Sequence, residues 1–162
     1  MNNLPNRLNG KLKDERGFNL IELMIVIAII GLLIAVGGYG WQAMMKSGNE
    51  TAAAQTLDKI RIFQAQYAGG HRGKFASFDE LIKTVGMDGT FAGDHPVVNG
   101  YTYTMVIEEQ SASKPAKYSV NADPQVAEGI AATGGIHFYT DSNIGTIRRN
   151  SDGPAKVDSD PL

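Results

Sequence analysis

The chain has 162 residues, 43% hydrophobic and 20% charged, which is enough for a single folded domain with a modest core. Its formal net charge of −2 gives no indication of a nucleic-acid binder. The absence of cysteine excludes a disulfide framework, a thiolate metal site, a cysteine nucleophile and a lipid-modified cysteine. Charge is uneven along the chain, since residues 1–17 hold four basic and two acidic residues and the rest holds 11 basic and 15 acidic. A basic start ahead of an apolar run favours a cytoplasmic position for that start.

An uncharged run of 19 residues extends from Leu23 to Trp41. As a helix it would be about 28 Å long, close to the roughly 30 Å of a bilayer core. Little sequence precedes the run to pack against it, so we expect a membrane-spanning helix. Three interpretations of the N-terminus fit the composition: an uncleaved anchor, a secretory signal cut after the run near Gly37, and a leader cut before the run.

The local sequence distinguishes these interpretations. Residues 16–31 read RGFNLIELMIVIAIIG. They resemble the N-terminal signal of type IV prepilins and type II secretion pseudopilins, in which glycine, an aromatic residue, a polar residue, Leu-Ile-Glu and a long apolar helix follow in fixed order. The resemblance implies that a prepilin peptidase cleaves between Gly17 and Phe18 and methylates the new amine of Phe18.

Glu22 is the acidic residue at the start of the apolar helix. A carboxylate in such a segment is costly to bury and indicates a function, although an acid at the membrane interface or a protonated acid would also fit. Cleavage would create an ammonium at Phe18, four positions earlier and, in a continuous helix, on the same face. The resemblance implies that Glu22 instead meets the Phe18 amine of a neighbouring subunit and sets the axial register of a filament.

Four glycines interrupt the apolar helix: Gly31, Gly37, Gly38 and Gly40. Each costs about 1 kcal/mol relative to alanine in a helix interior. Small residues also allow close packing between membrane helices. Many pilins carry a helix-breaking proline after the glycine equivalent to Gly31, and this chain has glycines there instead. We expect residues 31–41 to be the weak part of the helix in the assembled state.

Beyond Trp41 the helix becomes amphipathic, because Ala53, Leu57, Ile60 and Tyr67 form one apolar stripe. The sequence predicts one helix from about residue 18 to residue 68, ending near Gly69-Gly70. A capping box at Ser77 and Glu80 predicts a short helix over residues 78–85, stopped by Gly86, with a loop over 86–100.

Alternating residues predict strands at 101–109, 117–122, 135–140 and 145–149, the last two forming a hairpin around residues 141–143. The stripe on the helix is the available cover for the apolar face of this sheet. The fold class is therefore α+β, and the arrangement resembles the pilin fold. The predicted organisation is a leader (1–17), a transmembrane and assembly helix (18–41), a globular domain (42–149) and a flexible tail (150–162).

The sequence carries no recognisable catalytic or metal-binding motif, so it predicts neither an enzyme nor a cofactor. The three histidines (His71, His95 and His137) do not pair with acids at metal-ligand spacing. Asp141, Asn143 and Asp152 could supply oxygens to calcium, but formation of a turn explains the first two. Arg148 and Arg149, with Lys156 nearby, form a basic cluster that we interpret as a solvated strand edge, not a DNA-binding surface.

The predicted function is a structural subunit of a type IV pilus-like filament. The expected partners are other copies of the chain, the prepilin peptidase, membrane lipid before assembly and the inner-membrane assembly machinery. The expected location is the bacterial inner membrane for the precursor and subunit pool, and the cell surface or periplasm for the filament. The alternatives are the major pseudopilin of a type II secretion system, a secreted domain released near Gly37, and an anchored binding domain that never polymerises.

Overall fold

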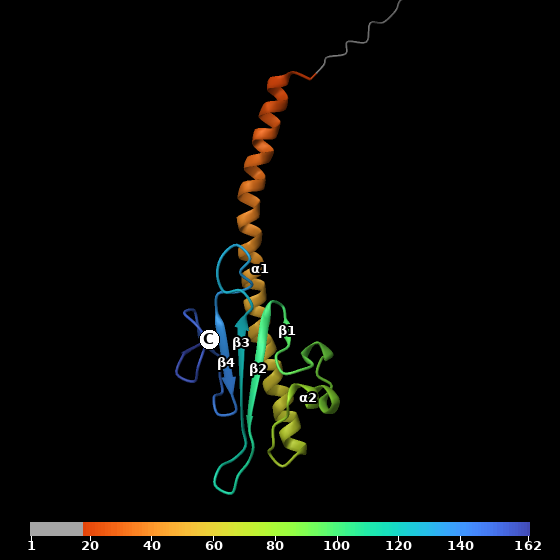
Figure 1. The fold of residues 1–162 in the computed structure, drawn as a ribbon, viewed down its shortest axis with the longest axis vertical. Coiled ribbons are helices and arrows are strands. Elements are labelled where there is room, and N and C mark those ends of the chain that lie inside the picture. Colours follow the sequence, from red (N-terminus) through yellow and green to blue (C-terminus); the bar gives the residue numbers. More distant parts are fainter. Residues whose placement is uncertain (1–17) are drawn as a thin grey trace, which may run out of the picture. The chain divides into compact units, whose positions relative to one another are not determined.

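The computed structural model describes residues 18–162 and divides into two units, the second beginning at Gly40 (Figure 1). Its longest element is helix α1, Leu20–Gly70, with 51 residues. The prediction of one helix over about 18–68 is therefore confirmed to within two residues at each end. The predicted leader, including Gly17, lies outside the described residues.

The unit that begins at Gly40 contains a six-stranded antiparallel sheet, with its strands ordered as in the sequence. The strands are β1 (Val97–Val98), β2 (Tyr101–Glu108), β3 (Lys117–Pro124), β4 (His137–Asp141), β5 (Arg148–Asn150) and β6 (Asp160–Pro161). Helix α2 (Phe78–Val85) and the short 3-10 helix η1 (Gly89–Phe91) come between α1 and β1 in the sequence. The long strands β2 and β3 run along the C-terminal part of α1 (Figure 1). The α+β fold class predicted from the sequence is confirmed.

The core forms between one face of the sheet and the apolar stripe of α1. Alternate residues of β2 and β3 turn inward, because successive side chains of a strand point to opposite faces. The stripe residues Ala53, Leu57 and Ile60 are fully buried. The inward strand residues of the core are Tyr101, Tyr103, Tyr118, Val120, Ala122 and Phe138. The predicted cover for the sheet is confirmed.

Gln64 is a fully buried polar residue on the same face of α1. Its side-chain amide donates to the Ala76 carbonyl at 2.6 Å and its oxygen accepts the Ala76 N–H at 3.0 Å. An unpaired buried backbone group is costly, so these two hydrogen bonds fix the segment between α1 and α2 at Ala76. This role of Gln64 was not predicted from the sequence.

Helix α2 has the predicted boundaries and the predicted capping box. The Ser77 hydroxyl accepts the Glu80 N–H at 3.4 Å, and the Glu80 carboxylate accepts the Ser77 N–H at 3.1 Å. Gly86 ends the helix in the left-handed region, at φ 75°, where its missing Cβ avoids a steric cost.

Replacing Ser77 with alanine should destabilise the globular unit by about 1 kcal/mol, because the first turn of α2 loses its cap. Denaturant unfolding of the chain in detergent would measure this change. The control is Thr84→Ala, an exposed substitution in the same helix that leaves the cap intact. Equal stability of the two variants would contradict the role of the cap.

Two short strands were missed in the sequence. Strand β1 pairs with β2 through a two-residue turn in which Asn99 and Gly100 both have positive φ, 51° and 73°. Asn-Gly between strand-forming residues is a strong hairpin signal, and the sequence analysis placed a loop there instead.

The prediction of a flexible tail over residues 150–162 is wrong. Strand β6 pairs with β5, and the Leu162 N–H donates to the Ile147 carbonyl at 2.9 Å. Ala155 is buried, and its carbonyl accepts a hydrogen bond from the Asn121 amide at 2.9 Å. The tail is polar because it lies at the surface, but its backbone is held by the sheet.

Four tyrosines of the sheet have pKa values raised above the ordinary value of 10.0, with burial the largest cause in each: Tyr101, Tyr103, Tyr118 and Tyr139.

At Tyr139, burial together with a hydrogen bond from its hydroxyl to Asp141 raises the pKa to about 12. A group whose pKa is higher in the folded state than in the unfolded state stabilises the fold at pH values below its unfolded-state pKa. That stabilisation is lost as the pH rises from about 10 through about 12. Comparing the phenolate absorbance titrations of the chain and of Tyr139→Phe would test this, and a Tyr139 titration at its ordinary value would contradict it.

Candidate functional site

Asn19 caps the N-terminal end of α1. Its carbonyl accepts the N–H groups of Glu22 and Leu23 at 2.9 and 3.2 Å, and its side-chain oxygen accepts the Ile21 N–H at 3.3 Å. Asparagine is among the preferred residues at this position. Glu22 lies in the first helical turn, where a negative charge complements the helix dipole. The cap was not predicted, although Asn before an apolar periodic segment is the usual signal of a helix N-cap.

Phe18 precedes this cap and is therefore not part of the helix in the structure. The shared helical face expected of Phe18 and Glu22 concerns the cleaved chain, and in the uncleaved chain the helix begins at Leu20. The side chain of Phe18 is 83% exposed. Whether cleavage and pairing occur at Gly17, Phe18 and Glu22 stays a prediction.

The first part of α1 presents a continuous apolar surface to its surroundings. Large side chains from Leu20 to Val36 are between 43% and 74% exposed. Among the described residues, one helix, α1, is long and apolar enough to cross a membrane. An exposed apolar surface of this size in a single chain requires lipid or another protein to cover it.

The four glycines of this segment lie inside the continuous helix. No other described segment has an atom within 4 Å of the place that a Cβ would take on Gly31, Gly37, Gly38 or Gly40. No close contact within the described chain therefore requires these glycines. The prediction of a weak helical segment concerns the assembled state and stays a prediction.

Within residues 18–162, no group of three or more metal-ligating side chains comes together. Asp141 is engaged in a turn, since its Oδ1 accepts the N–H groups of Asn143 and Ile144 at 2.7 and 2.8 Å. This agrees with the interpretation of Asp141 and Asn143 as turn residues. His137 and Asp123 form a cross-strand pair with 2.5 Å between Nδ1 and Oδ1. That pair was not predicted, because the two residues are 14 positions apart and meet through the register of β3 and β4.

The basic cluster does not lie on an edge strand as expected, because β5 pairs with both β4 and β6. Arg149 is exposed, and Arg148 is half-buried and donates to the Ser159 carbonyl at 3.4 Å. One of the two guanidinium groups is therefore engaged in holding the C-terminal segment.

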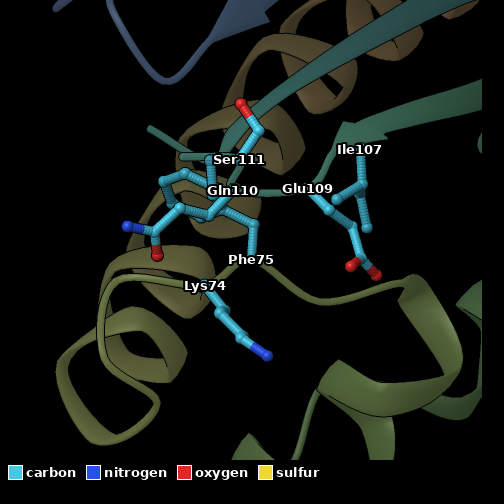
Figure 2. Close-up of a pocket in the computed structure, with 7 residues that line it drawn as sticks. Lys74, Phe75, Ile107, Glu109, Gln110 and Ser111 are labelled. Atoms are coloured by element: carbon cyan, nitrogen blue, oxygen red, sulfur yellow. The ribbon is translucent and has the colours of Figure 1, made fainter. Parts of the chain in front are cut away.

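A cavity of about 310 Å³ lies beside the turn between β2 and β3 (Figure 2). Its lining residues come from two places: Lys74 and Phe75 follow α1, and Ile107, Glu109, Gln110, Ser111 and Ala116 belong to the end of β2 and the turn. The lining combines one ammonium, one carboxylate and apolar groups, and no histidine.

Residues 12–38 match the prokaryotic N-terminal methylation motif. The chain is 28% identical over 116 residues to the fimbrial protein EcpC of Eikenella corrodens, an alignment covering 72% of this chain and 69% of that protein. It is 41% identical over 56 residues to the type IV wide pilus major component PilA4 of Thermus thermophilus, covering 35% of this chain and 43% of that protein. No solved structure matches the chain significantly.

These matches confirm the resemblance inferred from residues 16–31. They also support the predicted class of protein, a structural subunit rather than an enzyme.

Proposed function

We propose, from the premise that the chain is a type IV pilin-like structural subunit, that it is cleaved between Gly17 and Phe18, methylated on Phe18 and polymerised through α1. The globular unit would then form the filament surface. The precursor and the subunit pool would reside in the inner membrane, where the peptidase and the assembly machinery act.

The observation that carries this proposal is the exposed apolar surface of α1 behind a methylation motif. Burying one large aliphatic side chain is worth about 1.5–3 kcal/mol. Many such side chains are available between Leu20 and Val36, so helix packing would dominate filament cohesion. In the bilayer the same surface is covered by lipid, which explains how one segment serves both the stored and the assembled subunit.

Glu22 would contribute specificity rather than most of the energy. An ion pair taken out of water loses much of its attraction to desolvation, so its net contribution is small or uncertain in sign. An unpaired buried carboxylate is strongly unfavourable, however. Pairing with the Phe18 amine of a neighbour would therefore favour one axial register over all those that leave Glu22 without a partner. A methylated amine retains its charge, so methylation would not abolish the pair.

A surface pilus is favoured over a secretion pseudopilus, because the two relatives are named as a fimbrial protein and a pilus component. The amount of the chain in a sheared surface fraction would test this choice. Abundant recovery would support a pilus. Retention with the cells, combined with a secretion defect in a deletion strain, would support the major pseudopilin of a type II secretion system.

Mass spectrometry of the N-terminal peptide from native membranes tests the maturation step. A methylated Phe18 would support the proposal. A start at Gly38 would indicate a secreted soluble domain, and an unprocessed Met1 in a host that has the peptidase would indicate a plain anchor. Either of these two results would overturn the proposed maturation.

A further inference from the structure

The connection between β3 and β4 has an exposed apolar tip. We call residues 125–136 the β3–β4 loop. Residues 125–131 of this loop are all exposed, and Ile130 and Val126 are 78% and 41% exposed. The tip carries a single charged residue, Glu128. An isoleucine this exposed at a loop tip gains nothing for the stability of the fold.

The base of this loop is fixed to α1 and to the sheet. The Asn49 amide donates to the Thr133 carbonyl at 2.9 Å, and the Glu50 carboxylate accepts the Gly135 N–H at 2.8 Å. The Tyr101 hydroxyl donates to the Ile136 carbonyl at 2.8 Å. Two of these bonds hold the base of the loop against α1 and the third holds it against β2, so the tip is presented in a defined place.

The stretch of α1 just before this attachment is also apolar and exposed. Trp41, Met44 and Met45 are 66%, 72% and 50% exposed, and Lys46 is the first charged residue after Glu22. In Figure 1 the β3–β4 loop extends past the ends of the strands, alongside the first part of α1 that belongs to the same unit, from Gly40 onward. The exposed tip and the exposed helical stretch thus lie at the same end of the globular unit.

We propose that the β3–β4 loop inserts Ile130 into the interface of a phospholipid bilayer, next to the point where α1 leaves it. This inference rests on the proposed function, since it assumes that the preceding apolar run of α1 is embedded in lipid. Each polar layer of a bilayer is about 5–8 Å thick, and the helix from Trp41 to Lys46 advances about 7.5 Å. The headgroup layer would therefore surround residues 41–46 of α1, and the loop lies beside these residues.

The chemistry of both segments fits the headgroup region. Tryptophan is enriched at this depth, where its ring is partly apolar and partly hydrated. Lys46 would meet the lipid phosphate groups. Its ammonium also lies close to the base of the loop, since a Cβ added to Gly135 would be 2.6 Å from Nζ. A bilayer is a better partner than a second copy of the chain, because the exposed surface of the loop tip and of Trp41, Met44 and Met45 is small. Its helical residues also follow the apolar run directly in the sequence.

The full chain can be labelled at single sites because it has no cysteine and a single tryptophan. The test uses Ile130→Cys carrying a nitroxide, reconstituted in phosphatidylethanolamine–phosphatidylglycerol vesicles. Collision rates of the label with oxygen, which partitions into lipid, and with a water-soluble nickel chelate report its environment. The control is Val157→Cys, which replaces another exposed aliphatic residue, 58% exposed and outside the loop. Quenching of Trp41 by brominated lipid reports the embedding of α1 separately.

The expected result is a nickel collision rate severalfold lower, and an oxygen collision rate higher, at position 130 than at position 157. If brominated lipid quenches Trp41 but the collision rates are equal at positions 130 and 157, the loop inference is overturned and the proposed function stands. Absence of Trp41 quenching would contradict the membrane stage of the proposed function and the inference with it. Protection at position 130 that increases with the protein-to-lipid ratio would indicate contact with a second copy and would overturn insertion into lipid.

Discussion

Replacing Glu22 with alanine is expected to reduce filament yield by more than about tenfold while leaving cleavage at Gly17–Phe18 largely intact. The variant removes the carboxylate that would select one register. A tenfold change in an equilibrium constant corresponds to a free-energy difference of about 1.4 kcal/mol. A pair of opposite charges about 4 Å apart at an effective dielectric constant near 20 has an attraction of about 4 kcal/mol, before its desolvation is subtracted. The measurement is the amount of chain in the sheared surface fraction, with N-terminal mass spectrometry on the same cells.

Two further variants separate charge from the shape of the side chain. Glu22→Gln keeps the size and polarity and removes the charge, so it should assemble nearly as poorly as Glu22→Ala. Glu22→Asp keeps the charge and should recover part of the yield. Normal filament yield from Glu22→Ala, with processing intact, would count against a register pair. A loss of processing in all three variants would instead place Glu22 in recognition by the peptidase.

The N-terminal part of the chain is readable from its sequence because local chemistry determines it. An uncharged run predicts a spanning helix from composition alone, and the order of Gly17, Phe18 and Glu22 around its start carries the resemblance. The capping box at Ser77 was equally readable, since both of its hydrogen bonds connect residues three positions apart. The exact helix start was not, because it depends on whether Asn19 acts as a cap or as the next helical residue.

The missed features depend on pairing between distant parts of the chain. β6 consists of two exposed residues, and its partner β5 is 10 to 13 residues earlier, so no local periodicity announces either. The same holds for His137 and Asp123, which meet because β3 and β4 pair in one register. The register follows from burying Ala122 and Phe138 on the inner face, and the outward pair is a consequence of that burial.

Gln64 is the residue whose replacement should most damage the globular unit. Gln64→Leu keeps a similar volume in the core but leaves the N–H and carbonyl groups of Ala76 buried without partners. Each unsatisfied group costs about 1–3 kcal/mol, and burial of the apolar leucine side chain offsets part of the total, so we expect a net loss of about 2–4 kcal/mol. This corresponds to a fall of roughly 10 °C in the midpoint of thermal unfolding. Circular dichroism of the chain in detergent would measure it, with Gln66→Leu as the control on the exposed face of the same helix turn.

A carboxyl group at position 64 distinguishes lost hydrogen bonds from poor packing. Gln64→Glu has nearly the same shape, so packing alone predicts little change at any pH. When ionised, the carboxylate can accept the Ala76 N–H but faces the Ala76 carbonyl and is buried as a charge. When protonated, it can donate to that carbonyl and restore both bonds. Burial raises the pKa of such a group, so the stability of Gln64→Glu relative to the unchanged chain should increase as the pH falls. If the stability of Gln64→Glu equals that of the unchanged chain at every pH, the role of Gln64 is packing and not hydrogen bonding.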